Sequence, residues 1–297
     1  MKLQGYGENR LVAELLEGVS HFHKEVTVGP GDDCAVISQR GTKWDILLKT
    51  DSVVEGIHFA SDAPANWIGW KALCRSLSDV AAMGGESQFA LITLGLSGDI
   101  SVAWTKKLYS GICRAANHYN VEIVGGETVR TTGPVFITAS VTGRVEHGRA
   151  LLRSGARAGD AILVTGQLGG SIRGWHLKFQ PRVAEGRWLG LSGIVSAMMD
   201  LSDGLAADLP RLAQSSQLQY QLFEKAVPIR RGSSLAEALN DGEDYELLFT
   251  TSSQNLPKLL RQWAKNFPDL PLSVIGEFTD LPFKASTQNS LEGFHHF

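Results

Sequence analysis

Residues 45–83, DILLKTDSVVEGIHFASDAPANWIGWKALCRSLSDVAAM, contain the pattern that decides the fold. The first part, Asp45–Val53, is an apolar run that predicts a strand. The last part, Asn66–Met83, predicts a helix with one buried face. Its apolar side chains recur at steps of three and four residues: Trp70, Leu73, Leu77 and Val80.

On both sides of this stretch, strand and helix signals continue in mixed order. Strands are predicted at Cys34–Ile37, Phe89–Leu96, Val121–Val124 and Pro134–Arg144, and helices at Glu8–His21 and Ser101–Tyr119. This order leaves room for antiparallel pairing. It favours an α+β fold over a doubly wound parallel sheet.

A charged, glycine-containing stretch, Glu146–Asp160, separates this half from the remainder. The second half opens with the strand-like run Ala161–Thr165. Further signals follow at Ser202–Gln214, Tyr245–Thr250 and Leu256–Phe267. We therefore expect two domains, 1–145 and 146–297.

Composition narrows the classes of protein. The chain has 297 residues, 43% of them hydrophobic, and a net charge of −3, which argues against a general nucleic-acid binder. It contains no apolar run approaching the roughly 20 residues that span a bilayer. The three cysteines, Cys34, Cys74 and Cys113, form no C-x-x-C pair, so we expect a reducing cytoplasm.

The positions of the acidic residues indicate a possible functional site. Many of them lie in Gly/Ser/Thr-rich segments at the ends of apolar runs. These segments are Gly31-Asp32-Asp33, Thr50-Asp51, Ser78-Asp79, Gly125-Gly126-Glu127-Thr128, Asp200-Leu201-Ser202-Asp203-Gly204 and Gly242-Glu243-Asp244-Tyr245. Any one of them alone is typical of a helix cap or a turn. If they converge, they predict a site for Mg²⁺, Mn²⁺ or Ca²⁺, and Mg²⁺ suggests a polyphosphate substrate.

Other common site motifs are absent. The sequence has no G-x-x-x-x-G-K-[ST] loop, no protein-kinase signature set, no H-E-x-x-H and no G-x-S-x-G. The glycine-rich run Gly166–Gly170 is not a G-x-G-x-x-G motif. Zinc enzymes, hydrolase triads and P-loop nucleotide sites therefore have little support.

The acidic segments, in their order, resemble thiamine-monophosphate kinase, within the superfamily of aminoimidazole ribonucleotide synthetase. Two features distinguish this family from its superfamily relatives: the segment Val54-Glu55-Gly56-Ile57-His58-Phe59 and the ending Gly293-Phe294-His295-His296-Phe297. The stretch Arg153-Ser154-Gly155-Ala156-Arg157-Ala158-Gly159-Asp160 also matches. The resemblance covers nearly the whole chain.

The resemblance implies a two-domain α+β fold that dimerises through its N-terminal sheet, with the nucleotide in a cleft near the dimer contact. It implies transfer of the γ-phosphoryl group of ATP to thiamine monophosphate, assisted by several Mg²⁺ ions. The acceptor is a phosphate oxygen that is already anionic, so a strong general base is unnecessary. Neither nucleic acid nor a membrane is expected as a partner.

The resemblance also assigns roles to individual residues. The metal ligands would be Asp32, Asp33, Thr50, Asp51, Asp79, Glu127, Asp200 and Asp203, of which Asp33, Asp51, Asp79 and Asp203 would serve catalysis directly. Nucleotide contacts would come from Tyr109, Gly126, Arg153 and Ser202. The thiamine end would contact His58, Glu243, Asp244 and Phe294.

Simpler interpretations stay open for several of these residues. Arg153 could be a solvent-exposed arginine of the linker, and His58 could cap the end of a strand or lie in the core. Tyr109 and Phe294 could be packing residues. The chain also departs from the family pattern at Glu127, where Asp is usual, at Cys74-Arg75-Ser76, and at Leu291. Two other functions therefore remain: an ATP-dependent synthetase of the same superfamily, or a nucleotide-binding paralogue with weakened catalysis.

Overall fold

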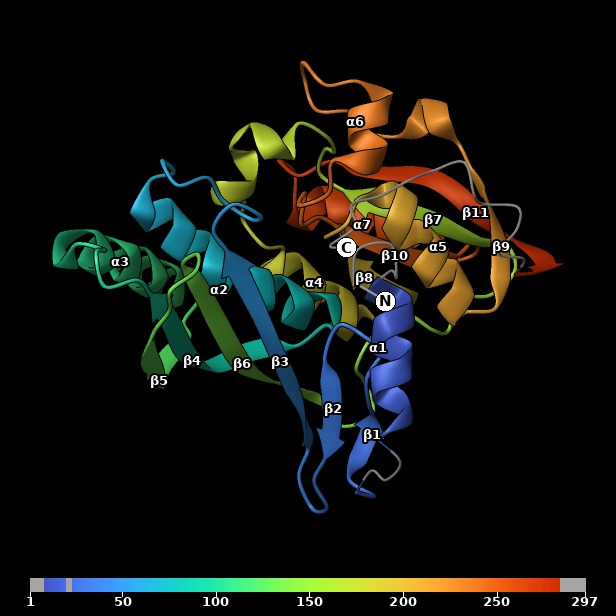
Figure 1. Ribbon diagram of the computed structural model, residues 1–297. Helices are drawn as coiled ribbons and strands as arrows, with labels where there is room; N and C mark the ends of the chain where they lie inside the picture. Colours follow the sequence, from blue (N-terminus) through green and yellow to red (C-terminus); the bar gives the residue numbers. More distant parts are fainter. Residues whose placement is uncertain (1–7, 20–22, 284–297) are drawn as a thin grey trace.

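The computed structural model describes residues 8–19 and 23–283, which fold into two α+β halves, each built on one sheet (Figure 1). The N-terminal sheet has the order β1 (Val26–Val28), β2 (Ala35–Ser38), β3 (Trp44–Val54), β6 (Phe136–Glu146), β4 (Glu86–Leu96), β5 (Glu122–Arg130). Its neighbours pair antiparallel, except that β4 and β5 are parallel. This mixed sheet agrees with the predicted α+β class.

The C-terminal sheet is antiparallel throughout. Its order is β8 (Val195–Asp200), β10 (Leu247–Ser252), β7 (Asp160–Thr165), β11 (Leu272–Pro282), β9 (Leu218–Leu222). The helices are α1 (Glu8–Glu17), α2 (Ala65–Ala82), α3 (Val102–His118), α4 (Val183–Ser192), α5 (Leu205–Ser215), α6 (Leu235–Asn240) and α7 (Leu256–Asn266), with short 3₁₀ turns at Ser171–Arg173, Trp175–Leu177 and Glu224–Ala226. Among the described helices, none is long and apolar enough to cross a membrane.

Helix α2 is buried on nearly all sides, because it lies between the N-terminal sheet and the C-terminal half (Figure 1). The predicted stripe of Leu73, Leu77 and Val80 belongs to the N-terminal core. Helix α3 packs closely against α2, and a Cβ added at Gly111 would lie 1.9 Å from the carbonyl oxygen of Asn66. Only glycine permits this approach.

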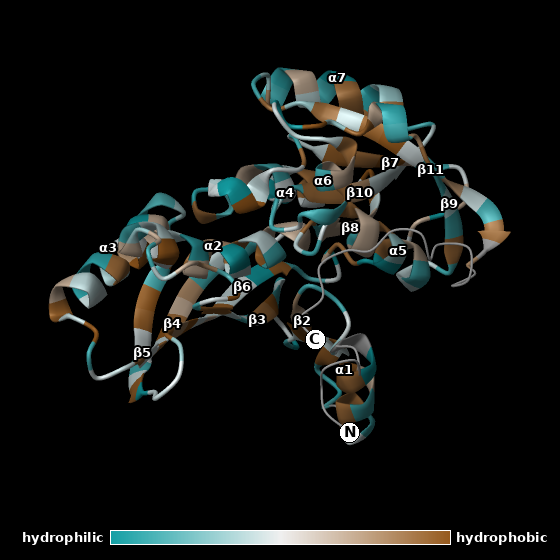
Figure 2. Ribbon diagram, turned by 45° about the horizontal axis from the view of Figure 1, so that its top comes forward, coloured by the Kyte–Doolittle hydropathy of each residue, from teal (hydrophilic) through white to brown (hydrophobic). Residues whose placement is uncertain are grey.

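The opposite face of the N-terminal sheet is apolar and exposed. In Figure 2, α2 and α3 lie against one face of β3, β6, β4 and β5, and apolar residues continue onto the strands. The other face forms a hollow of about 710 Å³. Leu48, Phe89, Leu91 and Val124 line it with 39%, 42%, 49% and 57% of their surface exposed.

The structure differs from the sequence prediction at the Gly-Gly segment of residues 125–128. We expected a strand ending at Val124, whereas β5 continues to Arg130 and pairs Gly126 with Ile92. Gly126 has φ +155° and fits against the Ile92 carbonyl, where a Cβ would approach to 1.9 Å. The glycine therefore serves strand pairing rather than a turn.

Candidate active site

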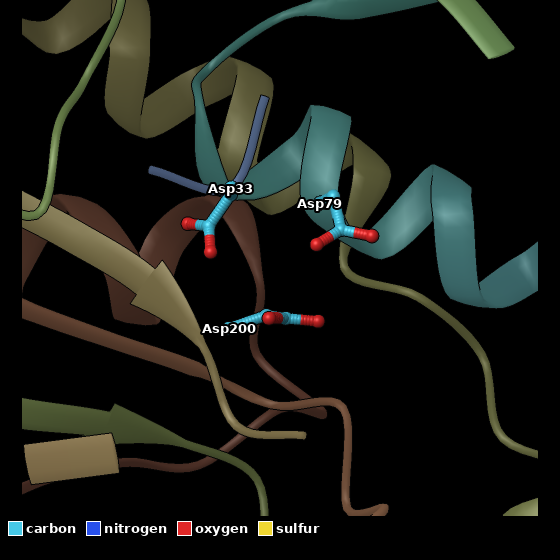
Figure 3. A group of neighbouring side chains, drawn as sticks. All are labelled: Asp33, Asp79 and Asp200. Carbon is cyan, nitrogen blue, oxygen red and sulfur yellow. The ribbon is translucent and has the colours of Figure 1, made fainter. Parts of the chain in front are cut away.

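Three aspartates from distant parts of the chain meet where the two halves join. Asp33 lies between β1 and β2, Asp79 on α2, and Asp200 at the end of β8. One carboxylate oxygen from each lies within 4.8 Å of the others. Figure 3 shows the three carboxylates directed into a common space. All three are buried, with 2%, 6% and 2% of their surface exposed. The predicted convergence of these three acids is therefore present within one chain.

The surroundings of this aspartate triad compensate only part of its charge. Arg153 donates to Asp33 Oδ1 through Nε (3.0 Å) and Nη2, Lys49 Nζ lies 2.7 Å from Asp79 Oδ1, and the Ser78 hydroxyl donates to Asp200 Oδ2 (2.6 Å). Asp33 Oδ2 is buried without a hydrogen-bond partner among the described residues. An unsatisfied buried carboxylate oxygen is costly. The triad therefore suits an additional cation.

The raised pKa values of Asp79 and Asp200 are consistent with too little positive charge around the triad. Burial raises the pKa of Asp79 well above its usual value, although the Lys49 ammonium opposes the shift. Burial and the charge of Asp33 raise the pKa of Asp200 to about 7. Hard oxygen donors at this spacing are the ligands that Mg²⁺ prefers. Asp33, Asp79 and Asp200 thus have the chemistry and the placement to hold such an ion.

Two further predicted acids flank the triad. Asp32 accepts hydrogen bonds from the backbone N–H groups of Asp33 (2.9 Å) and Arg153 (3.1 Å), and burial together with the Asp33 charge raises its pKa to about 6. Asp51, on β3, forms an ion pair with Arg75 Nε at 3.2 Å. Both acids are only partly buried, so they can approach a ligand bound at the triad.

A narrow pocket of about 70 Å³ contains four of the other predicted residues. His58, Ser202, Asp203 and Glu243 line it together with Ile57, Arg75, Ile172, Asp241 and Tyr245. Its wall comes from α2, from the loop after β3 and from the C-terminal half. Two of the four predicted thiamine contacts, His58 and Glu243, therefore share one pocket with the predicted nucleotide contact Ser202.

Glu243 is held ionised in this pocket. Burial alone would raise its pKa, but the hydrogen bond from His176 and the charges of Lys71 and Arg75 lower that pKa to about 2. His176 Nδ1 lies 2.8 Å from Glu243 Oε2. Lys71 is fully buried, and burial lowers its pKa to about 8. The pocket therefore contains a fixed carboxylate that can accept hydrogen bonds from a ligand.

Asp203 and Asp244 are engaged by basic residues of the C-terminal half. Asp203 forms an ion pair with Arg211, which also contacts Asp208 at 2.8 Å. Asp244 accepts from the Gly169 N–H (3.0 Å) and from Arg230 (3.0 Å), and it does not line the pocket around Glu243. Of the two predicted acids at 243 and 244, the structure thus places only Glu243 at the pocket.

Three predicted residues lie elsewhere. Tyr109, Gly126 and Glu127 line a separate hollow of about 260 Å³ at the β5 edge of the N-terminal sheet. Strands β6 and β4 separate β5 from β3, which holds Asp51. Glu127 therefore does not join the aspartate triad within one chain. The reason is strand order, which the sequence pattern does not reveal.

Thr50 lies on the face of β3 away from the triad. Neighbouring residues of a strand point to opposite faces, so Thr50 faces away from Asp51. Its hydroxyl shares a hydrogen bond with Ser140 Oγ (2.9 Å) on the exposed sheet face. The Thr50 hydroxyl is therefore not at the triad. Phe294 lies outside the described residues.

Of the basic residues at the site, Arg153 was predicted from the sequence, whereas Lys49, Lys71 and Arg75 were missed. Lys71, Arg75 and Asp79 follow one another at four-residue steps, which places them on one face of α2. Lys49 precedes Asp51 by two residues and so shares its face of β3. Both spacings are visible in the sequence and could have identified these residues as neighbours of the acids.

Comparison with known proteins places this arrangement in a family. Family models described as AIR synthase related protein match the chain twice, the N-terminal domain at residues 31–145 and the C-terminal domain at residues 157–285. The thiamine-monophosphate kinase of Rhodopirellula baltica is 36% identical over 256 residues, 80% of each chain. That of Escherichia coli is 32% identical over 302 residues, 92% of this chain and 90% of the relative.

Solved structures agree with these relatives. A structure described as AaThiL complexed with AMPPCP and TMP has a TM-score of 0.81 and 29% identity, covering 100% of this chain and 99% of that one. The thiamine-monophosphate kinase structure from Stenotrophomonas maltophilia has a TM-score of 0.74 and 30% identity, covering 92% and 93%. With domain matches, curated relatives and overall fold in agreement, the chain belongs to the thiamine-monophosphate kinase family of AIR synthase related proteins.

Proposed function

We propose that this chain transfers the γ-phosphoryl group of ATP to thiamine monophosphate, producing thiamine diphosphate and ADP. The observation that carries the proposal is the full-length likeness to a kinase structure described as a complex with AMPPCP and TMP. In this chain helix α2 contributes Asp79 to the aspartate triad and Lys71 to the contacts of Glu243, so the two sites are neighbours along one face of the helix. Such a pair of neighbouring sites suits a donor and an acceptor.

Mg²⁺ is the proposed metal, and Asp33, Asp79 and Asp200 are the proposed ligands nearest to one another. The buried Asp33 Oδ2, which lacks a partner among the described residues, supports a cation at this position. Asp32, Asp51 and Asp203 remain proposed ligands for ions that arrive with the nucleotide. When bound, the metal would screen the repulsion between two polyanions and fix the geometry of their phosphates.

The chain's own residues bind and orient the two substrates. Arg153 is placed to exchange its bond with Asp33 for a bidentate contact with nucleotide phosphate. Ser202 would contact the nucleotide from the pocket wall, while His58 and the ionised Glu243 would hold the thiamine end. Arg75 lies between this pocket and Asp51 and suits the acceptor phosphate. The acceptor oxygen is already anionic, so no residue needs to remove a proton from it.

A homodimer formed through the exposed face of the N-terminal sheet is part of the proposal. This face has a hollow of about 710 Å³ and exposes Leu48, Phe89, Leu91 and Val124. A contiguous apolar surface of this kind is unusual on a monomer. A second copy would cover the hollow and would bring its own Tyr109, Gly126 and Glu127 towards β3 of the first. These three residues would then reach the nucleotide site as predicted.

The two halves of the chain would contribute different parts of the proposed active site. Residues 1–145 would supply most metal ligands and the dimer contact, and residues 146–297 would complete the nucleotide and thiamine sites.

We propose that the reaction takes place in the cytoplasm. The three cysteines are free, and two of them, Cys34 and Cys74, are buried thiols that suit a reducing compartment.

The deciding experiment measures thiamine diphosphate by chromatography with purified protein, ATP, Mg²⁺ and thiamine monophosphate, and with each component omitted in turn. We expect product only in the complete mixture. ADP release with a different acceptor would instead indicate a synthetase of the same superfamily. ATP binding without product at any Mg²⁺ concentration would refute the kinase assignment and indicate a paralogue that has lost catalysis.

A further inference from the structure

Lys49 is a basic residue placed directly at an acidic site. It lies on β3 with its side chain directed towards α2, and its ammonium is 2.7 Å from Asp79 Oδ1. Only 23% of its side chain is exposed. Asp51, two residues further along the same face of β3, is a second carboxylate whose charge acts on Lys49. The ammonium is thus held near two carboxylates that belong to the proposed metal site.

The charges around the site suggest why a lysine is present. The three triad acids are joined by two neighbours: Asp32 precedes Asp33 and accepts its N–H, and the charge of Asp51 acts on Asp79. The cations that contact them are Arg153 on Asp33, Lys49 on Asp79 and Arg75 on Asp51. With every acid ionised the remaining charge is −2, which a single divalent ion neutralises. Without Lys49 it would be −3, and a single divalent ion would leave one carboxylate uncompensated.

We propose that the Lys49 ammonium takes the place of a divalent ion beside Asp79 and Asp51, so that the nucleotide-free site binds one ion fewer than its carboxylates would otherwise hold. The inference rests on the proposed magnesium site. An ammonium tethered to β3 cannot be lost by dilution, whereas a divalent ion can. It also offers only N–H donors, so it can neutralise Asp79 but cannot act as a Lewis acid. Divalent ions would then be concentrated on the Asp33 and Asp200 side of the triad.

Removing the charge of Lys49 should change the number of divalent ions that the chain binds. Replacing Lys49 by a neutral residue removes the positive charge beside Asp79 Oδ1 and Asp51. Two carboxylates without a cation then attract a divalent ion. Retaining the positive charge with arginine should keep that position closed.

The test counts Mn²⁺ ions bound to the full chain without nucleotide, using the electron paramagnetic resonance signal of free Mn²⁺. The variants are Lys49→Met, Lys49→Gln and Lys49→Arg, with Lys107→Met on the exposed surface of α3 as the matched control. We expect Lys49→Met and Lys49→Gln to bind one more Mn²⁺ per chain than the wild type, and Lys49→Arg and Lys107→Met to bind the wild-type number. Glutamine can still donate a hydrogen bond to Asp79, so this variant provides the measurement if the methionine variant does not fold.

The possible failures are distinguishable. If the wild type binds Mn²⁺ and both neutral variants bind the same number or fewer, the role of Lys49 is refuted while the metal site stands. If the wild type binds no Mn²⁺, the metal site itself is refuted and the inference falls with it. A Lys49→Met protein that loses ATP affinity with an unchanged Mn²⁺ count would show Lys49 to be a phosphate ligand, which also overturns the inference.

Discussion

Lys71 Nζ lies 2.7 Å from each carboxylate oxygen of Glu243, and the two residues come from different halves of the chain. The same ammonium donates to the backbone carbonyl of His58 (2.6 Å) and lies 2.7 Å from His176 Nδ1. One fully buried lysine therefore joins α2, the loop after β3 and the loop that precedes β10. Both proposed thiamine contacts, His58 and Glu243, depend on it for their position.

Replacing Lys71 by methionine should weaken both stability and substrate binding. Removing one partner of a buried ion pair leaves a buried charge and typically costs about 3–5 kcal/mol. We expect a loss of this size in urea denaturation and a higher KM for thiamine monophosphate, with the KM for ATP little changed. The double variant Lys71→Met/Glu243→Gln should regain part of the stability, because the Glu243 carboxylate is no longer left without the Lys71 ammonium. A loss below about 1 kcal/mol, as for a surface pair, would contradict this account.

Replacing Asp79 by asparagine should lower kcat at saturating ATP by at least about a hundredfold, because the acid is central to the proposed metal site. In the absence of divalent ions the same change relieves repulsion among the three carboxylates but leaves the Lys49 ammonium without its partner, so we expect no net gain in stability. Steady-state kinetics and thermal melts in EDTA measure the two effects. Asp269→Asn, at an exposed position, is the control. Unchanged kcat would place the reacting phosphates elsewhere.

The stability of the metal-free protein should fall as the pH rises from about 4 to about 7. Burial raises the pKa of Asp200 from 3.8 to about 7 and that of Asp32 from 3.8 to about 6. Between the unfolded and folded pKa values the folded state binds more protons, so raising the pH favours unfolding. The contribution is fully present below the unfolded pKa and is lost as the pH passes the folded value.

Urea denaturation at several pH values in EDTA measures this slope. The Asp200→Asn variant should show a shallower fall than the wild type, because one of the raised groups is missing. Added Mn²⁺ should also flatten the curve, since the ion stabilises the ionised carboxylates. Equal slopes for wild type and variant would mean that Asp200 does not carry the effect.

Complementation can test whether two copies share one active site. Asp79→Asn and Glu127→Ala should each be inactive alone. In a mixed dimer, one of the two sites would combine an intact Asp79 with an intact Glu127 of the other copy. Random pairing should then restore about one quarter of the wild-type rate. Adding Leu91→Glu to both chains places a charge on the exposed sheet face and should abolish the recovery, whereas Val102→Glu on α3 should not. No recovery in the mixed dimer would argue against a shared site.

The predicted elements were most accurate where one pattern dominated. The helix expected at Asn66–Met83 is α2, Ala65–Ala82, and the strand expected at Asp45–Val53 is β3, Trp44–Val54. Their periodic apolar faces agree with the burial that tertiary packing gives them. β1 was missed, because three residues are too few to show a period. The Gly-Gly segment in β5 misled the prediction, because its glycines respond to a neighbouring strand.

The acidic residues of the candidate site could be predicted from the sequence, whereas most of its basic residues could not. Asp33, Asp79 and Asp200 were named through the family resemblance, and the fold unites them. Lys49 and Lys71 form no sequence motif with their ion-pair partners, Asp79 and Glu243, because those partners lie on other elements, although the spacing of each lysine from an acid of its own element is visible. Thr50 could have been separated from the Asp51 side of β3 by strand alternation alone. The remote position of Glu127 depends on strand order, which is a property of the assembled sheet.

Helix α2 has one more consequence. It holds Lys71 against Glu243 at the proposed thiamine pocket and Asp79 at the triad, eight residues apart on one buried face. Eight residues of α-helix span about 12 Å, and a helix enclosed on nearly all sides cannot stretch or bend easily. The helix thereby sets the spacing between these two residues. The separation between the proposed metal site and the pocket around Glu243 is therefore fixed by the helix before any ligand binds.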